Sequence, residues 1–206
     1  EEVHVAEQRD IAVAALGHDP ETLKVVIVQL ASIFRDNKPV EMSTRRGQYI
    51  TLREVLDEVG VDASRFYFLM RKTSAHLAFD LQLAKKQSAD NPVYYVQYAH
   101  ARISSILRQA GESAALEAAD ISVLKEKEEL QLIKKLWQFA YIIDVCAETL
   151  DPYMLTVYLQ ELAETLHRFY DRHRVLGGEP AKTTGRLALI LAAKTVLANG
   201  LRLAGV

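Results

Sequence analysis

The chain has 206 residues, 50% hydrophobic and 25% charged, so it can bury a sizeable core. Its net charge of -2 excludes a protein that coats nucleic acid through overall basicity, so any RNA site must be local. The single Cys146 excludes an intrachain disulfide framework and a cysteine-based zinc site. No apolar run is expected to span a bilayer and no signal peptide opens the sequence, which predicts a cytoplasmic protein.

The first forty residues predict a helix, a strand and a hairpin. Residues 1–17 are typical of a helix that ends at Gly17. Residues 23–30 are rich in β-branched side chains and predict a mostly buried strand. Residues 33–40 predict a hairpin whose turn is Asp36-Asn37-Lys38-Pro39. One buried strand without further α/β alternation is typical of the end of a Rossmann-type domain, not of a complete one.

Two short helices are predicted next. Thr51 and Glu54 form a capping box for the first, which Gly60 ends. Asp62 is expected to cap the second. From Leu52 to the end of the chain we expect no sheet.

Residues 90–102 open a long helix, with Asn91 as the cap and Pro92 at the first helical position. At 100° per residue, two faces separate. The apolar face consists of Val96, Ala99, Ile103, Ile106 and Leu107. The second face consists of Tyr94, Tyr98, Arg102 and Ser105.

This second face has two interpretations. Aromatic rings stack on unpaired bases and arginine binds phosphate, so the face suits single-stranded RNA. Alternatively, the tyrosines complete the core and Arg102 pairs with a carboxylate on a helix. Periodicity alone leaves both open.

The C-terminal half predicts a bundle of antiparallel long helices. Including the helix just described, they should begin near Pro92, Leu124, Pro152 and Gly185, and the longest should cover residues 124–150.

Several side chains in this half carry specific predictions. Leu136, Trp137 and Ala140 are expected to be mostly buried, and Tyr158 to reach solvent at the edge of a buried stripe. His167-Arg168 and residues 172–174 place positive charge in the last turns of a helix, where the dipole favours it. The alternative is contact with an RNA backbone.

Residues 90–102 resemble the signature that opens the anticodon-binding domain of bacterial arginyl-tRNA synthetases, and the resemblance extends over most of the chain. It implies a mainly α fold, in which an anticodon-binding helical bundle follows a short α/β remnant of a Rossmann-type catalytic domain. Residues 1–46 would end the catalytic domain, residues 47–89 would form connecting helices along the tRNA stem, and residues 90–206 would form the bundle.

Residues 41–46 resemble a divergent KMSKS loop, which in class I synthetases closes over ATP and stabilises its phosphates. The residues assigned to the loop are Met42, Ser43, Thr44 and Arg45. Glu41 and Thr44 stand where the family usually has lysines. An ordinary surface loop is the alternative.

The resemblance implies a fragment of an arginine–tRNA ligase, which activates L-arginine with Mg-bound ATP and transfers it to tRNA(Arg). Because the HIGH-type motif is absent, we expect the fragment to be inactive, with no cofactor and no metal site. We expect tRNA as the partner of a monomer, without membrane or DNA. The rivals are a helical protein-interaction module and a freestanding tRNA-binding paralogue.

For anticodon recognition, the resemblance implies a pocket that reads the middle cytosine. Its expected residues are Tyr94, Tyr98, Arg102, Arg108 and Tyr158. Tyr98 would stack on a base or shape the pocket. Arg102 and Arg108 would bind phosphate or base edges.

Overall fold

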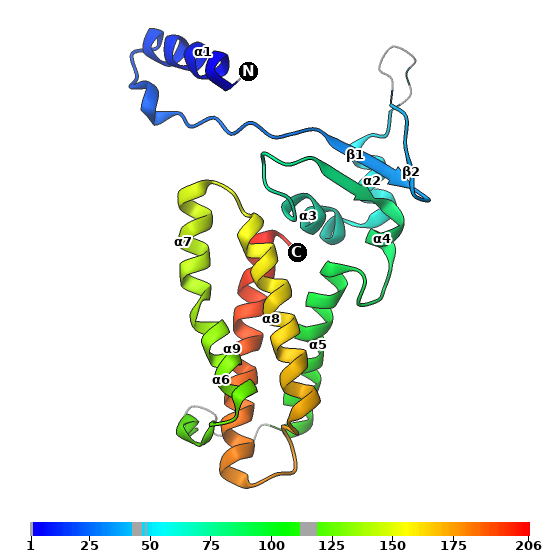
Figure 1. Cartoon of the computed structure of the whole chain (residues 1–206), viewed down its shortest axis with the longest axis vertical. Coiled ribbons are helices and arrows are strands. Elements are labelled where there is room, and N and C mark those ends of the chain that lie inside the picture. The colour runs from blue at the N-terminus through cyan, green and yellow to red at the C-terminus, as the bar shows by residue number, and fades with distance from the viewer. Residues whose placement is uncertain (1, 43–46, 48, 112–118) are drawn as a thin grey trace.

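The computed structural model describes residues 2–42, 47, 49–111 and 119–206. Figure 1 shows an elongated bundle of long helices, a small sheet with short helices at one end of it, and a separate helix that an extended segment joins to the sheet. In chain order the elements are α1 (Glu2–Ala15), η1 (Pro20–Thr22), β1 (Ala31–Arg35), β2 (Lys38–Pro39), α2 (Leu52–Val59), α3 (Val61–Leu69), β3 (Leu77–Asp80), α4 (Leu81–Lys85), α5 (Pro92–Ala110), η4 (Ile121–Val123), α6 (Lys127–Trp137), α7 (Phe139–Thr149), α8 (Tyr153–Arg172) and α9 (Pro180–Ala204).

The sheet has the strand order β2-β1-β3. The predicted hairpin is confirmed, because β1 and β2 pair antiparallel. Its turn is shorter than predicted: Asp36 and Asn37 lie at φ of 51° and 60°, as a two-residue turn requires, and Lys38 and Pro39 belong to β2. The prediction of no sheet from Leu52 onward is wrong, since β3 pairs parallel to β1. This pairing joins segments separated by α2 and α3, so no local sequence pattern predicts it.

The segment 23–30 is extended but forms no strand, which corrects the prediction of a buried one. Its apolar side chains are exposed except for the half-buried Ile27, with Val28 at 67% and Leu30 at 81%. Gln29 N–H donates to the carbonyl of Thr73 at 2.9 Å, but no ladder forms within the described residues. β-Branched residues favour a strand only where neighbouring strands cover them.

The capping box of Thr51 and Glu54 is confirmed at the start of α2. Gly60 ends α2 at a φ of 91° and also occupies the N-cap of α3. Asp62 therefore lies in the first turn of α3 and does not cap it, because two helices share one glycine.

The mainly α fold is confirmed. Figure 1 shows that α5 and α8 run in one direction along the bundle and α6, α7 and α9 in the other. The long helices begin at Pro92, Lys127, Tyr153 and Pro180, near the predicted starts. The core between α8 and α9 is close-packed, since a Cβ at Gly200 would lie 2.5 Å from Leu159 Cδ2.

The helix predicted over 124–150 is two helices, α6 and α7, that meet at Gln138. The longest helix is instead α9, with 25 residues. The break corrects the prediction of burial around Trp137, which is 83% exposed, while Ala140 is exposed and Leu136 half-buried. An interruption changes the direction in which the following side chains point. Residues that would share one buried face of a continuous helix are therefore partly exposed.

α9 is also apolar and long enough to cross a membrane by length and composition, which corrects the statement that no such run exists. It packs against α5, α6 and α8 inside the bundle. Its buried residues include Leu187, Ile190, Ala193 and Leu197. It therefore packs as a core helix of the bundle.

Candidate nucleic-acid interface

The start of α5 is fixed by its cap. Asn91 is 4% exposed, and its Nδ2 donates to the carbonyls of Ala84 at 3.0 Å and Lys86 at 2.8 Å. Its Oδ1 accepts from Val93 N–H at 3.2 Å, and Pro92 occupies the first turn. The predicted cap is confirmed, and it also ties α5 to α4.

The two predicted faces of α5 separate in the structure. Val93, Val96, Ala99 and Ile103 are buried in the bundle core. On the other face, Tyr98 is 47% exposed and Tyr94 is half-buried. Tyr98 therefore offers an accessible ring at the surface.

Aromatic rings from α5 and α8 meet beside this face. The Tyr94 and Tyr98 ring centroids lie 6.3 Å apart, with planes inclined by 16°. His167 of α8 lies 6.0 Å from Tyr98 at 23° and 4.7 Å from Tyr95 at 46°. These rings border a pocket of about 460 Å³, called here the aromatic pocket, whose lining is Ala89, Tyr94, Tyr95, Tyr98, His167 and Asp171.

Two polar atoms next to the aromatic pocket are buried without a hydrogen-bond partner among the described residues. They are His167 Nε2 and the Tyr170 hydroxyl. Burial lowers the pKa of His167, and the positive charge of Arg102 lowers it further. Burial also raises the pKa of Tyr170. Buried polar atoms are usually paired, so this cluster is unusual for a core.

Arg102 lies one helical turn beyond Tyr98, and its guanidinium carbon is 5.0 Å from the centroid of the Tyr170 ring. The side chain is exposed. Within the described residues no carboxylate pairs with it, contrary to the alternative in which Arg102 closes a helix–helix ion pair. This cation–π contact holds an exposed positive charge near the aromatic pocket.

Arg108 and Met42, two further residues of the predicted sites, do not line this pocket. Arg108 is exposed on α5, about 15 Å along the helix from Tyr98 at 1.5 Å per residue, and does not line the pocket. Of the four residues assigned to ATP binding in the KMSKS-like loop, only Met42 belongs to the described residues, at 46% exposed. Ser43, Thr44 and Arg45 lie outside them.

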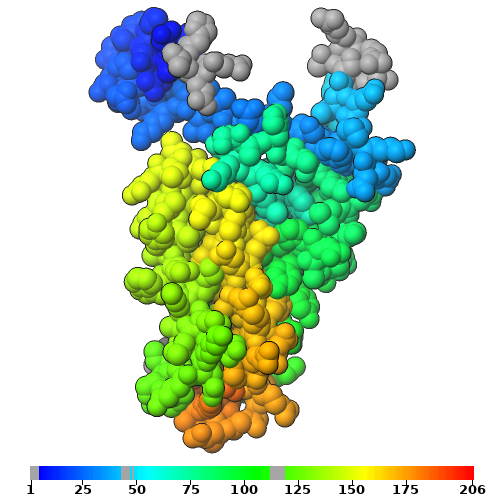
Figure 2. Space-filling model, in the orientation of Figure 1, coloured from blue at the N-terminus to red at the C-terminus, as the bar shows by residue number. Residues whose placement is uncertain are grey.

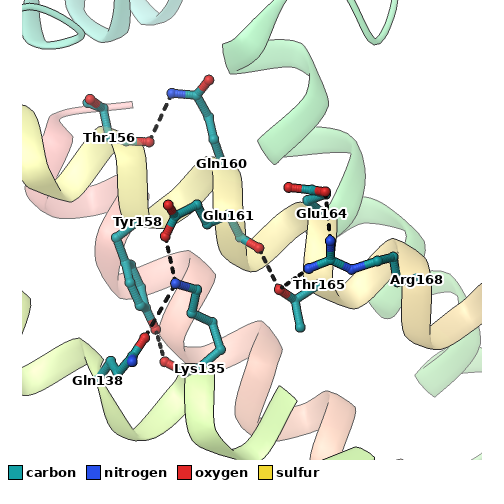
Figure 3. A network of polar contacts seen from close by, with 9 residues as sticks. All are labelled: Lys135, Gln138, Thr156, Tyr158, Gln160, Glu161, Glu164, Thr165 and Arg168. Carbon is teal, nitrogen blue, oxygen red and sulfur yellow. Dashed lines mark hydrogen bonds and ion pairs between the residues drawn. The ribbon is translucent and has the colours of Figure 1, made fainter. Parts of the chain in front are cut away.

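Tyr158 was expected to reach solvent, and this is wrong. The residue is 1% exposed, and its hydroxyl donates to the carbonyl of Lys135 at 3.0 Å (Figure 3). Lys135 Nζ lies 5.5 Å from the Tyr158 ring centroid and 2.6 Å from a carboxylate oxygen of Glu161. Tyr158 therefore joins α6 to α8 in the core, because the packing of α6 covers the edge of the stripe.

A second hollow of about 690 Å³ lies between α6 and α8, with a polar lining. Its residues are Lys127, Glu128, Gln131, Arg168, Asp171 and Arg172. Figure 2 shows α8 exposed along this face of the bundle, between α6–α7 and α5. Asp171 lines both the polar hollow and the aromatic pocket.

The α8 half of the aromatic pocket was not predicted. The sequence predicts for His167 either a charge that the helix dipole favours or a contact with an RNA backbone, and it makes no prediction for Asp171. The two are four residues apart on α8, so they share a face, but only the position of α5 shows that this face is aromatic. Within the described residues, no group of three or more His, Cys, Asp or Glu side chains is arranged to hold a metal ion.

A family model, the DALR anticodon binding domain, matches residues 96–206. The arginine–tRNA ligase of Nitrosospira multiformis is 48% identical over 196 residues, which cover 95% of this chain and 34% of the relative. That of Carboxydothermus hydrogenoformans is 47% identical over 207 residues, covering 98% and 37%. The chain thus spans about a third of the length of these relatives.

Solved structures agree with these similarities. A protein described as an arginyl-tRNA synthetase from Campylobacter jejuni has a TM-score of 0.84 and 30% identity, covering 95% of this chain and 42% of that one. The arginyl-tRNA synthetase of Thermus thermophilus has a TM-score of 0.64 and 30% identity, covering 79% and 28%.

Proposed function

This chain belongs to the DALR anticodon-binding domain family, and on that premise we propose that it is the tRNA-reading part of an arginine–tRNA ligase. The observation that carries the proposal is the aromatic pocket between α5 and α8. It places an exposed ring, Tyr98, beside an exposed cation, Arg102, on a chain whose net charge is slightly negative.

In this proposal an unpaired base of the anticodon loop stacks on Tyr98. Stacking on an aromatic side chain stabilises binding by about 1–3 kcal/mol per base. The guanidinium of Arg102 binds a phosphate of the same strand, and each phosphate contact makes binding weaker as salt rises. Tyr94, which stacks on Tyr98, and His167, which lies across from it, hold the ring in place.

The parent enzyme would activate L-arginine with ATP and transfer it to tRNA(Arg), in the cytoplasm and as a monomer. The KMSKS-like loop would contribute Arg45 and its neighbours to the phosphates of Mg-bound ATP. Names of the relatives support the ligase activity, whereas the loop assignment rests on the sequence resemblance. Residues 1–46, 47–89 and 90–206 would form the catalytic end, the connecting helices and the anticodon-binding bundle.

A helical protein-interaction module is the second candidate function, and one observation favours it. Leu130, Trp137 and Tyr141 of α6 and α7 are 51%, 83% and 68% exposed. Large exposed apolar side chains commonly mark protein interfaces. A freestanding tRNA-binding paralogue would share the aromatic pocket but lack aminoacylation.

Binding of a tRNA(Arg) transcript to the 206-residue chain, measured by fluorescence anisotropy across a salt series, tests the proposal. Tyr98→Ala should weaken binding about 10- to 100-fold, as expected for one lost stacking contact. Tyr141→Ala is the matched control, since it also removes an exposed ring but from α7. If a folded Tyr98→Ala variant binds normally, or if only Tyr141→Ala weakens binding, the anticodon lies elsewhere.

A further inference from the structure

Asp171 is the one carboxylate that lines the aromatic pocket. It lies in the last turn of α8, one turn beyond His167 and on the same face. The carboxylate is exposed, and the described residues give it no hydrogen bond and no ion pair. Its neighbours in the pocket are mainly aromatic rings.

The helix itself does not favour an anion at this position. The C-terminal end of a helix carries partial negative charge, which destabilises a carboxylate in the last turn. An RNA backbone would repel it as well. A carboxylate that lines the pocket and has no partner among the described residues is available to accept a hydrogen bond from a ligand group.

We propose that Asp171 is a specificity-determining residue, whose carboxylate accepts a hydrogen bond from the exocyclic amine of the base stacked in the aromatic pocket. This inference rests on the proposed function and deepens it. Cytosine and adenine present an amine donor where uracil presents a carbonyl acceptor. Asp171 therefore attracts an amino-bearing base and repels uracil, since two acceptors would face each other.

On the other side of Asp171, the polar hollow carries Arg168 and Arg172. Arg168 Nη1 binds Glu164 Oε1 at 2.8 Å and its Nη2 donates to Thr165 Oγ1 at 3.2 Å. Arg172 extends from the next position along the helix. The positive charge of Arg172 offsets part of the charge of Asp171 toward an incoming strand, whereas that of Arg168 is shared with Glu164.

The test uses stem–loop RNAs in which each unpaired position in turn carries cytosine or uracil. The 206-residue chain should bind cytosine about tenfold more tightly than uracil at one position, as expected for one hydrogen bond to a charged acceptor. In Asp171→Asn, whose amide both donates and accepts, this ratio should fall toward one and the uracil loop should bind more tightly. Asp144→Asn is the control, an exposed aspartate on α7 outside the pocket.

A second measurement replaces the selected cytosine by pyrimidin-2-one, which keeps the ring and lacks the amine. This replacement should weaken binding to the unaltered chain about tenfold and weaken binding to Asp171→Asn much less, because the neutral amide oxygen accepts a weaker hydrogen bond from the amine than the carboxylate does. The melting temperature of Asp171→Asn should stay level or rise, since the anion at the helix end is gone. A residue with a merely structural role would not produce this pattern.

The outcomes separate the two proposals. Preference for cytosine that persists in Asp171→Asn, or no preference at any loop position, overturns the role of Asp171 while Tyr98-dependent binding still supports the pocket. If no RNA binds in a Tyr98-dependent manner, the proposed function fails and this inference fails with it.

Discussion

The end of α8 contributes to two regions, one with buried polar atoms that lack hydrogen-bond partners and one in which the polar atoms are paired. Toward α5, His167 Nε2 and the Tyr170 hydroxyl are buried without partners among the described residues. Toward α6 and α9, His173 Nε2 lies 3.0 Å from Glu128 and its Nδ1 lies 3.3 Å from Arg186 Nη2. Because arginine is only a donor, Nδ1 accepts and Nε2–H donates.

The second region, called here the paired network, continues through Arg186. Its Nε donates to Glu129 Oε1 at 2.7 Å and its Nη1 to the carbonyl of Arg174 at 2.8 Å. Glu129 is fully buried and also accepts from Glu126 N–H at 2.9 Å. Each unpaired buried polar group costs about 1–3 kcal/mol. The paired network therefore favours stability, whereas the unpaired groups beside the aromatic pocket lower stability next to the proposed binding surface.

The largest expected effect comes from breaking the paired network. Glu129→Ala leaves Arg186, whose side chain is 12% exposed, without its carboxylate, and should cost about 3–5 kcal/mol of unfolding free energy. Urea denaturation measures this cost, and the folded variant should still bind tRNA.

The control for this prediction replaces both charges, as Glu129→Met with Arg186→Met. Removing the whole pair leaves no uncompensated charge and should restore most of the lost stability. A loss below about 1 kcal/mol in Glu129→Ala would show that the network is not the stabilising region.

Arg102→Ala tests the other region and should act on binding more than on folding. Loss of a phosphate contact should weaken tRNA binding about tenfold and reduce the slope of log affinity against log salt by about 0.7. Lys134→Ala, which removes an exposed charge on α6, is the control. An unchanged salt slope with a lower melting temperature would make Arg102 a packing residue over Tyr170.

Tyr158→Phe should have a smaller effect, on stability and not on tRNA binding. It removes the hydroxyl that binds the Lys135 carbonyl, which should cost about 1 kcal/mol of stability and leave tRNA affinity unchanged. Thermal unfolding and anisotropy on the same sample measure both quantities. Weaker tRNA binding at unchanged stability would restore Tyr158 as a candidate anticodon contact.

The smallest expected effect is a pH dependence of stability that originates in the aromatic pocket. Burial lowers the pKa of His167 in the folded chain, so the unfolded chain binds the proton more tightly. Its contribution to stability is therefore complete above the unfolded value of about 6.5 and is lost as pH falls below it.

Burial lowers the pKa of His100 in the same way, so His167→Gln should reduce the acid dependence without abolishing it. Denaturation midpoints measured between neutral and mildly acidic pH check this. An identical pH profile in His167→Gln would mean that His167 is not titrating in a buried state.

The α5 half of the aromatic pocket was predictable, and the α8 half was not. Tyr94, Tyr98 and Arg102 recur at the spacing of one helix, so their shared face follows from helical geometry. His167 and Asp171 join them across a helix–helix contact, and nothing near them in the chain indicates which helix lies opposite. Whether the site residues touch tRNA stays a prediction.

The sequence by itself determined the local features: the hairpin turn at Asp36 and Asn37, the capping box at Thr51, the cap at Asn91 and the apolar stripes of α5 and α8. These depend on interactions within a few residues, where φ preferences and short side chains decide. Only the tertiary structure decided the parallel pairing of β3, the burial of Tyr158 and the exposure of Trp137. Those depend on which distant segment covers a side chain, because burial is a property of neighbours and not of the residue that is buried.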